Sequence, residues 1–316
     1  MKKNIGIIGF GETGMRLAMA FRLIGDDDID IAGVVEPDEE LYRRGCEWHN
    51  QEFSLFGSVQ ELMDYVEPDG IVIAAPPESH LEILEQFGGY SVPIFLVTPL
   101  EASLENTAEI VRFAQAYSAP VVAGPVARYA PVMGKARELL ASGRIGKLRS
   151  FQFLGPAGVH NLNLGLFLTG AEPLSVSMAA GPDSSVSVIR FDNGVFGSCA
   201  CGGGERLWTF DGSQGFMRIA PECGEIKVFP SGDSGLVETY QFDYFGKPDY
   251  NGGAFAARYF YDLLCGREAG EAGMVWQAFA AELVKFAAEL SMKEDSRYVR
   301  LAELMPDDLA AEMGQG

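Results

Sequence analysis

Short apolar runs and segments with helical spacing alternate through the first part of the chain. The apolar runs, rich in β-branched residues, predict strands at 4–10, 29–35, 70–75, 94–98 and 120–123. Ser58, Ser79 and Ser103 are placed to begin three of the helices between them. Ser58 and Ser79 are each followed three residues later by glutamate, the pattern of a capping box. Such regular alternation is typical of a doubly wound parallel sheet, which is predicted for residues 1–122.

The pattern then changes to alternation of apolar and polar residues. Helices are predicted over 132–141 and, near the end of the chain, over 275–290. Strands are predicted at 147–154, 174–180, 185–191, 195–201, 206–210, 216–220, 225–229 and 237–242. The sequence Asp-Asn-Gly at 192–194 predicts a hairpin turn. Because helices are missing between most of these strands, residues 123–316 are predicted to form an α+β domain with an open, mainly antiparallel sheet.

Composition and charge narrow the class of protein. The chain has 316 residues, 47% of them hydrophobic, and a formal net charge of −20. This length suits two ordinary domains, and the charge would repel nucleic acid and anionic membranes. No stretch reaches the roughly 18–20 apolar residues of a membrane span, and the glycine-broken start is a poor match to a signal peptide. Five cysteines without a Cys-x-x-Cys pair favour a reduced, cytoplasmic compartment and no metal site.

A glycine motif, GIIGFGETG, ends the first predicted strand and opens the first predicted helix. Gly9 would allow the tight turn, and Gly11 would let the backbone approach a pyrophosphate. Gly14 would let the helix and strand pack closely. A strand before the motif and a helix after it are the context that a dinucleotide-binding loop requires. The predicted cofactor-binding residues of this loop are Gly9, Phe10, Gly11, Glu12, Thr13 and Gly14.

An acidic residue, Glu36, ends the second predicted strand, 22 residues after Gly14. A carboxylate at this place can accept hydrogen bonds from both hydroxyls of the adenosine ribose and would repel a 2′-phosphate. NAD is therefore the predicted cofactor, and NADP is less favoured.

Several stretches, in this order and spacing, resemble one oxidoreductase family along nearly the whole chain. They are GIIGFGETG, IVIAAPPESH (71–80), IFLVTPLEAS (94–103), ARYAPVMGKARELLASGRIGKL (127–148), GVHNLNLGLFLTGAEP (158–173) and FDNGVFGS (191–198). The family is that of glucose–fructose oxidoreductase and inositol dehydrogenase (Gfo/Idh/MocA). The resemblance implies a Rossmann domain, an open sheet domain, bound NAD or NADP, and oxidation or reduction of sugars, polyols or related carbonyls.

The resemblance also implies further site residues and an assembly. It adds Ala75, Pro76, His80 and Thr98 to the predicted cofactor-binding residues. Relatives of this fold commonly pair through the sheet domain, whose alternating pattern leaves one broad face to cover. A homodimer or homotetramer is therefore expected.

The chain departs from the family at the residues that usually carry the chemistry. The family usually has Glu-Lys-Pro at the end of the fourth long strand, with the lysine as acid and base, whereas this chain has Val-Thr-Pro with Thr98 in the lysine position. The family's Asp-x-x-x-His pair maps to Pro156 and His160, so the carboxylate is missing. Asn163 stands where aspartate is common. Since a positioned acid or base contributes about 10²–10⁴-fold, its loss should cripple alcohol oxidation.

Three histidines are candidates for proton transfer. His160, at the position of the family's catalytic imidazole, is the tentative catalytic residue, with a buried structural histidine as the alternative. His80 is interpreted as structural or as bordering the cofactor. His49 is interpreted as part of a polar loop and is expected to face solvent. Arg128 could bind an anionic substrate, brace the cofactor or form a structural ion pair.

These observations leave rival functions. The first is an NAD-dependent oxidoreductase that transfers hydride to or from a small carbonyl, imine or enone, with atypical acid/base residues. The second is a catalytically degenerate NAD-binding sensor or partner protein, suggested by the loss of both lysine and aspartate. A structural module without a cofactor is the weakest alternative because the glycine motif is complete.

Overall fold

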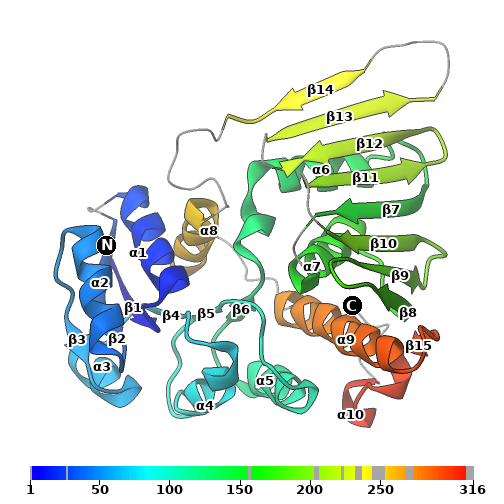
Figure 1. The fold of residues 1–316 in the computed structure, drawn as a ribbon. Helices are drawn as coiled ribbons and strands as arrows, with labels where there is room; N and C mark the ends of the chain where they lie inside the picture. Colours follow the sequence, from blue (N-terminus) through cyan, green and yellow to red (C-terminus); the bar gives the residue numbers. More distant parts are fainter. Residues whose placement is uncertain are drawn as a thin grey trace. The chain divides into compact units, whose positions relative to one another are not determined.

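The computed structural model describes residues 2–25, 28–155, 158–202, 206–221, 224–231, 237–243, 253–267 and 273–310. The chain divides into two compact units (Figure 1). The first comprises Met1–Tyr129 and Asn251–Phe279, and the second comprises Ala130–Tyr250 and Ala280–Gly316. The first unit is therefore discontinuous in sequence, and its later segment falls within the range 123–316 that the sequence pattern assigned to the second domain.

A six-stranded parallel sheet forms the centre of the first unit, in the order β3-β2-β1-β4-β5-β6. This is the Rossmann order, and it confirms the predicted doubly wound sheet. Its strands are β1 Lys3–Ile8, β2 Ile29–Val35, β3 Leu55–Phe56, β4 Gly70–Ile73, β5 Ile94–Leu96 and β6 Val121–Ala123. The two-residue β3 is too short to give a pattern, and the sequence analysis did not predict it.

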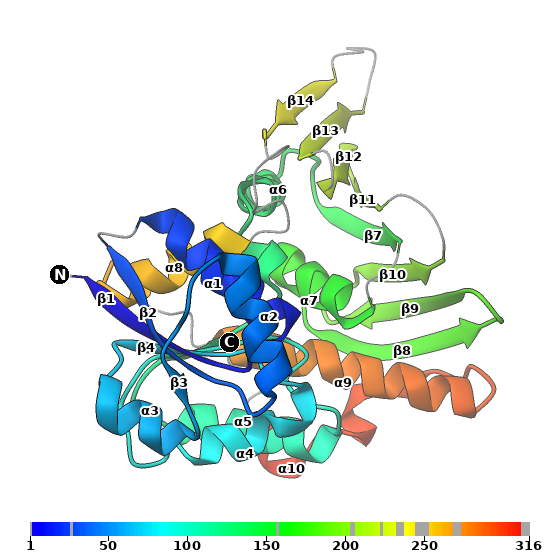
Figure 2. The same ribbon diagram turned by 60° about the vertical axis from the view of Figure 1, so that its left-hand side comes forward.

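Helices lie on both sides of this sheet, with α1 and α8 on one side and α3 to α5 on the other (Figure 2). The helical elements are α1 Glu12–Ile24, α2 Glu39–His49, α3 Val59–Val66, η1 Pro77–Ser79, α4 His80–Glu85, α5 Leu104–Ala116, η2 Val126–Tyr129 and α8 Gly253–Leu264. The ring of Phe260 from α8 packs edge-on against Phe21 of α1 and Phe95 of β5, at 6.3 and 5.7 Å between ring centroids. Complete burial of such a ring contributes about 1.5–3 kcal/mol, so α8 supplies part of the core of this unit.

Two of the three predicted serine caps are confirmed. Ser58 Oγ accepts a hydrogen bond from the Glu61 N–H at 3.1 Å, and Ser103 Oγ accepts one from the Asn106 N–H at 3.2 Å. The predicted cap at Ser79 is wrong, because its side chain makes no capping hydrogen bond. A 3₁₀ turn over Pro77–Ser79 leads directly into α4, so Ser79 already has a helical backbone and cannot act as the extended cap residue.

A nine-stranded sheet dominates the second unit, in the order β14-β13-β12-β11-β7-β10-β9-β8-β15. Neighbouring strands are antiparallel except β7 and β10, which are parallel, so the mainly antiparallel sheet is confirmed. The strands are β7 Leu148–Leu154, β8 Pro173–Ala180, β9 Ser185–Phe191, β10 Phe196–Cys201, β11 Leu207–Gly212, β12 Gly215–Ala220, β13 Glu225–Pro230, β14 Glu238–Gln241 and β15 Val299–Arg300.

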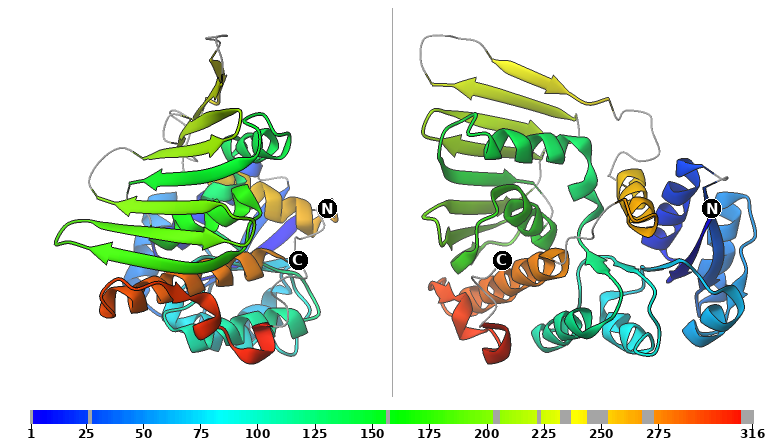
Figure 3. Two further views of the ribbon diagram at one scale, coloured as in Figure 1. Left: turned by 90° about the vertical axis from the view of Figure 1, so that its right-hand side faces the viewer. Right: turned by 180° about the vertical axis from the view of Figure 1, so that it is seen from behind.

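One face of this sheet packs against α6 Pro131–Ala141 and α7 Gly158–Thr169 (Figure 3). Further helical elements are α9 Gly273–Lys293, which contributes residues to both units, η4 Leu301–Glu303 and α10 Asp307–Ala310. Under α7, the face carries a layer of buried aromatic rings, Phe151, Phe153, Trp208 and Phe210. A Cβ on Gly165 of α7 would lie 3.1 Å from the Phe153 ring, so a glycine lets this helix approach the aromatic layer closely.

Candidate cofactor and catalytic sites

The predicted cofactor-binding residues of the first unit follow the carboxyl ends of four neighbouring strands. Gly9 follows β1, Glu36 follows β2, Ala75 follows β4 and Thr98 follows β5. A backbone hydrogen bond continues the sheet to this edge: the Gly9 N–H donates to the carbonyl oxygen of Val35 at 2.9 Å. Ligands of doubly wound sheets bind at this edge, outside the carboxyl ends of the strands. The topology therefore brings these residues to one edge.

Gly9 and Gly14 are required by close packing within the loop. Gly9 has φ of +86°, and a Cβ on it would lie 2.5 Å from the Ala75 amide nitrogen. A Cβ on Gly14 would collide with the carbonyl oxygen of Gly9. Both glycines are therefore needed by the protein itself, to seat α1 against β1 and β4.

Gly11 differs from the other two glycines. A Cβ built on it meets no atom within 4 Å, and its φ of −66° is available to any residue. Gly11 is also the N-terminal cap residue of α1 and makes no side-chain capping bond. The first amides of a helix have no intrahelical acceptors and attract anions. The open space at Gly11, next to these amides, fits the pyrophosphate of a dinucleotide.

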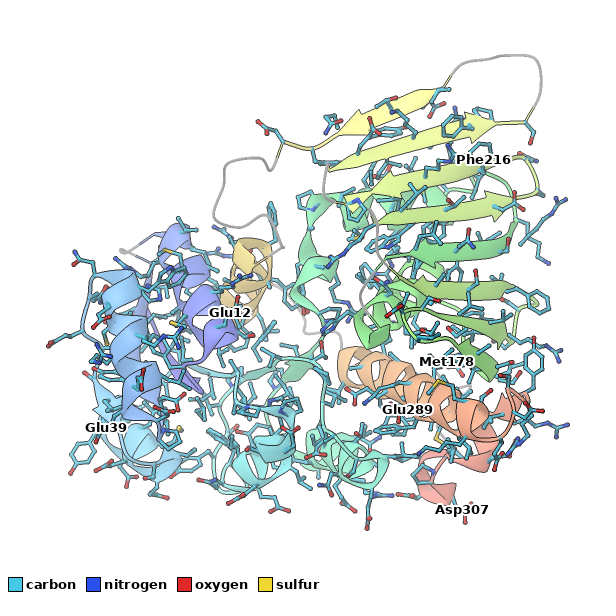
Figure 4. All side chains as sticks on the ribbon, viewed as in Figure 1. Glu12, Glu39, Met178, Phe216, Glu289 and Asp307 are labelled. Carbon is cyan, nitrogen blue, oxygen red and sulfur yellow. The ribbon has the colours of Figure 1, made fainter. Side chains whose placement is uncertain are left out.

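The side chains of Glu12 and Thr13 are exposed at the start of α1, where Figure 4 shows Glu12. Glu12 forms an ion pair with Arg16 at 2.6 Å. Glu12 also borders a groove of about 560 Å³ between α1 and α2. The other residues that line this groove are Met15, Arg16, Arg44, Glu47 and Trp48. The helix start is thus open to solvent, as a site for a phosphate group requires.

Glu36 joins two loops through its carboxylate. Oε2 accepts the N–H of Phe10 at 2.6 Å, and Oε1 accepts the N–H of Asp38 at 3.0 Å. The residue is buried, with 8% of its surface exposed. Each carboxylate oxygen has more than one lone pair, so both can accept ribose hydroxyls in addition to these amides. The position and chemistry of Glu36 fit the adenosine ribose of NAD.

Phe10 contributes its backbone to the loop and its ring to the core. The ring is fully buried and packs against Tyr42, His49 and Phe53, with the Phe53 ring edge-on at 5.3 Å between centroids. It also fills the space that a side chain on Gly45 of α2 would occupy. The Phe10 ring therefore fixes α2 against the loop, and only its backbone is placed for a ligand.

The expectation that His49 lies in a loop and faces solvent is wrong. His49 ends α2 and is only 5% exposed. Its Nε2 lies 3.0 Å from the carbonyl oxygen of Met15, and its Nδ1 lies 3.5 Å from Nη1 of Arg22. Burial lowers the pKa of His49, and the charge of Arg22 lowers it further. The sequence around His49 is polar, but its side of the helix faces Phe10, and this contact across the fold has no local signal.

His80 connects the loops that follow β4 and β5. It is fully buried, with Nε2 at 2.8 Å from the Ala75 carbonyl oxygen and Nδ1 at 2.8 Å from that of Leu100. Burial lowers the pKa of His80, while the two carbonyls and the Glu101 carboxylate oppose this shift. With both nitrogens facing backbone carbonyls, His80 positions the segments that carry Ala75 and Thr98.

Thr98 lies two residues beyond the end of β5, half-buried, and the Thr98–Pro99 peptide bond is cis. The predicted location at the carboxyl end of this strand is therefore observed, although the strand itself ends at Leu96. A threonine hydroxyl can donate and accept hydrogen bonds but does not carry a proton near neutral pH.

Arg128 is buried and belongs to η2 of the first unit. Its Nη2 donates to Oε1 of Gln277 at 2.5 Å. Gln277 lies in the part of α9 that belongs to the same unit. This contact ties the end of the Rossmann segment to the returning segment of the chain.

His160 lies in the first turn of α7 in the second unit, where it is mostly buried. Burial lowers the pKa of His160, and the nearby charge of Arg206 lowers it further. Arg206 precedes β11 and lies beside Gly155. A Cβ on Gly155 would be 3.2 Å from the Cα of Arg206. Both effects favour the uncharged imidazole, which is able to accept a proton. Pro156 lies outside the described residues. The sequence analysis missed Arg206, because its position beside His160 depends on strand pairing.

Asn163 is one turn further along α7 and is only 2% exposed. Neither its Oδ1 nor its Nδ2 has a hydrogen-bond partner among the described residues. Most buried side-chain amides are hydrogen-bonded, so Asn163 is an exception to the usual pairing.

Within the parts of the chain that the structure describes, no helix has the length and apolar character to cross a membrane. In the same parts, no group of three or more histidine, cysteine, aspartate or glutamate side chains is arranged to hold a metal ion.

Comparisons with known proteins agree with this geometry. Residues 3–124 match the family described as "Oxidoreductase family, NAD-binding Rossmann fold" (GFO_IDH_MocA). The chain is 21% identical over 259 residues to the rhizopine catabolism protein MocA of Rhizobium meliloti, covering 75% of this chain and 75% of that protein. It is 22% identical over 219 residues to inositol 2-dehydrogenase of Rhizobium meliloti (strain 1021), covering 60% and 65%.

A solved structure shares the fold of nearly the whole chain. Levoglucosan dehydrogenase, in a complex with NADH and levoglucosan, has a TM-score of 0.83 and 16% sequence identity, and the match covers 95% of this chain and 100% of that one. At this identity the likeness shows the fold, a Rossmann sheet followed by a mainly antiparallel sheet.

Proposed function

We propose that the protein is an NAD(H)-dependent oxidoreductase, because residues 3–124 match the model of the Gfo/Idh/MocA oxidoreductase family with its NAD-binding Rossmann fold. It would transfer hydride to or from a small carbonyl, imine or enone related to sugars or polyols. The observation that carries this proposal is the glycine loop, with open space at Gly11 and the carboxylate of Glu36 beside it.

The first unit would hold the cofactor through its loop residues. Gly11 leaves room for the pyrophosphate at the start of α1, and Glu36 would accept the ribose hydroxyls. The same carboxylate would repel the 2′-phosphate of NADP. Ala75, Pro76, His80 and Thr98 complete the proposed cofactor-binding edge. Bound NAD(H) supplies the hydride chemistry, and the chain supplies binding, orientation and proton transfer.

His160 is the proposed proton carrier, since Thr98 cannot replace a catalytic lysine. A neutral imidazole can take the hydroxyl proton in the oxidation direction, but its lowered pKa makes it a weak base. Such a site is best suited to alcohols whose hydroxyl proton is easily removed, or to acceptors that are already activated for the addition of hydride.

A binding and turnover experiment tests the function. NADH and NADPH are titrated at equal concentrations while the melting temperature is followed, and NADH consumption is then measured with a panel of small ketones, imines and enones. We expect a larger stabilisation by NADH and measurable consumption with at least one class. Equal or larger stabilisation by NADPH would remove the role given to Glu36.

The second candidate is an NAD-binding sensor or partner protein without turnover. It is favoured by the threonine at position 98 and by Pro156 in the place of the family's aspartate. Stabilisation by NADH without hydride transfer to any acceptor would select this function.

A homodimer or homotetramer is proposed through the uncovered face of the second sheet. On that face, Val186 and Phe196 are 46% and 48% exposed. The strand register places Phe216 in the same row as Phe196, and Phe216 stacks on Phe229 at 4.4 Å between ring centroids. Figure 4 shows Phe216 on β12. We further propose a cytoplasmic location, because the five cysteines form no Cys-x-x-Cys pair, and small-molecule substrates, because of the family match. The net charge of −20 speaks against nucleic-acid or membrane partners.

A further inference from the structure

The α1–α2 groove is a hollow in the first unit that the proposed cofactor contacts do not fill. Its volume of about 560 Å³ is that of a site for a small molecule. Each helix contributes a stripe of residues at positions i, i+3 and i+4, which lie on one helical face. The stripes are Glu12, Met15 and Arg16 on α1, and Arg44, Glu47 and Trp48 on α2. All six residues belong to the first unit, so the groove is formed within one compact body.

α1 and α2 lie side by side (Figure 1), and contacts between them fix the width of the groove. Nε2 of His49, at the end of α2, lies 3.0 Å from the carbonyl oxygen of Met15. A Cβ on Gly45 would lie 3.3 Å from the Met15 side chain, so α2 approaches α1 closely at this point. The His49 ring meets the Trp48 ring edge-on at 4.9 Å between centroids. The walls are therefore formed before a ligand arrives, which lowers the entropic cost of binding.

The walls of the groove favour a flat aromatic ligand. Trp48 is 53% exposed, although tryptophan is highly buried on average. Arg16 and Arg44 line the same groove. Guanidinium groups stack on aromatic rings, and an indole packs against other rings in offset or edge-on arrangements. An aromatic ligand gains these contacts, whereas an aliphatic one of the same size gains only from its apolar surface.

The carboxylates that line the groove have an arginine partner, but one guanidinium that lines it has no carboxylate. Glu12 forms an ion pair with Arg16 at 2.6 Å. Glu47 forms one with Arg43 at 2.5 Å. Arg44 makes no hydrogen bond or ion pair with any part of the chain that the structure describes. The guanidinium N–H groups of Arg44 are therefore available to an anion.

We propose that the α1–α2 groove is a second ligand site, which binds an aromatic carboxylate. The ring would lie against Trp48, and the carboxylate would accept two parallel N–H groups of Arg44. Because the protein has a net charge of −20, binding of an anion depends on such a local cation. This inference goes beyond the proposed function and does not rest on it.

The place of the groove gives a ligand there a route to the cofactor loop. Glu12 is the first residue of α1 and follows Gly11, where the pyrophosphate is proposed to lie. Gly11 itself does not line the groove. An aromatic acid would therefore bind next to the cofactor position without occupying it. Any change that it causes in the affinity for NADH must be matched by an equal change that NADH causes in its own affinity.

The test uses 2-naphthoate as the probe on the full-length protein, with two matched analogues. 2-Naphthylmethanol keeps the rings without the charge, and decahydronaphthalene-2-carboxylate keeps the charge without the aromatic rings. Calorimetry measures the three affinities. The chain has three tryptophans, so ¹⁹F NMR of protein labelled with 5-fluorotryptophan shows which of them the probe meets. Trp48→Phe identifies the signal of Trp48.

Two variants alter the groove and two serve as controls. Arg44→Gln removes the guanidinium, and Trp48→Leu removes the indole. Arg149→Gln removes an exposed arginine from β7, and Tyr65→Leu removes a 79% exposed ring from α3. All four positions are exposed, so the melting temperatures should change little and report that each variant is folded.

We expect 2-naphthoate to bind with a dissociation constant of roughly 1 mM or below and to shift chiefly the Trp48 signal. Arg44→Gln should weaken binding roughly 10-fold, and so should loss of the charge in 2-naphthylmethanol. Trp48→Leu should weaken it roughly 2–10-fold, and so should loss of the aromatic rings in the decahydro analogue. Both control variants should bind 2-naphthoate like the unmodified protein.

Several results would overturn the site. These are no binding of 2-naphthoate at about 10 mM, equal binding of all three compounds, full affinity in both groove variants, and an equal loss of affinity in the controls. Binding that saturating NADH abolishes would make the groove part of the cofactor site and would also overturn it. Binding of 2-naphthoate by a protein that does not respond to NADH would remove the proposed function and leave this site standing, so the two failures are distinguishable.

Discussion

The carboxylate of Glu36 accepts the backbone N–H of Phe10 at 2.6 Å, which joins the end of β2 to the glycine loop. Glu36→Gln would replace one carboxylate oxygen by an amide that donates, and this amide would face the N–H of Phe10 or of Asp38. We expect a loss of about 1–3 kcal/mol in unfolding free energy and a weaker preference for NADH over NADPH. Thermal melts with each cofactor measure both effects.

The control for this prediction is Glu39→Gln, which removes a negative charge from the exposed first turn of α2. It should leave the cofactor preference unchanged. An equal loss of preference in both variants would mean that overall charge, and not the position of Glu36, discriminates between the cofactors.

Gly11→Val should abolish the response to NADH while leaving the fold intact, because its side chain would enter open space that the pyrophosphate is expected to fill. Gly134→Val on the exposed part of α6, where a Cβ also meets nothing within 4 Å, is the matched control and should keep the full response. Gly14→Ala should unfold or strongly destabilise the protein without ligand. A normal NADH response in Gly11→Val would place the cofactor elsewhere.

The unmodified protein should show little or no oxidation of polyols or sugars with NAD⁺, because Thr98 takes the place of the family's lysine and no lysine takes the hydroxyl proton. The missing base should cost about 10²–10⁴-fold in rate. Thr98→Lys should raise the rate of NAD⁺ reduction if the loop after β5 keeps the family geometry. Rapid polyol oxidation by the unmodified protein that persists in His160→Ala would reveal a different acid or base.

Stability should fall on acidification through the ordinary histidine pKa of 6.5. The folded pKa of His49 is lowered, so the folded state binds fewer protons than the unfolded state in this range. The stabilisation is complete above pH 6.5 and decreases below it, until the folded histidine also protonates. His80 and His160 have lowered pKa values for the same main reason and act in the same direction.

Melting temperatures between about pH 7.5 and 5.5 measure this dependence. In His49→Gln the decrease should be smaller, because a glutamine can serve the Met15 carbonyl without titrating. A dependence that is unchanged in the variant would assign the effect to the other histidines or to carboxylates.

Association through the uncovered sheet face should give a particle larger than the 34.2 kDa chain in light scattering. Phe196→Asp should reduce its mass, because it would place a charge among apolar contacts. Gln60→Asp on α3 of the first unit serves as the control. A monomer at micromolar concentration would contradict the proposed homodimer or homotetramer.

The elements that the sequence predicted are those whose signals are local. The strand before Gly9, the acid at Glu36 and the caps at Ser58 and Ser103 each depend on residues within one strand or one helical turn. What could not be predicted depends on contacts between distant segments. His49 is buried because Phe10 lies against it, and the burial of Asn163, whose amide has no partner among the described residues, depends on how α7 packs in the second unit.

The return of α8 to the first unit has a consequence for the order in which the protein can fold. Phe260 meets Phe21 and Phe95, and its ring lies where a side chain on Gly70 would stand. The growing chain therefore cannot complete the core of its N-terminal Rossmann unit until residues 253–264 have left the ribosome, after almost all of the second sheet has been synthesised. Until then, the apolar surface of Phe21 and Phe95 that Phe260 covers remains exposed, and the second unit also still lacks its last segment, Ala280–Gly316.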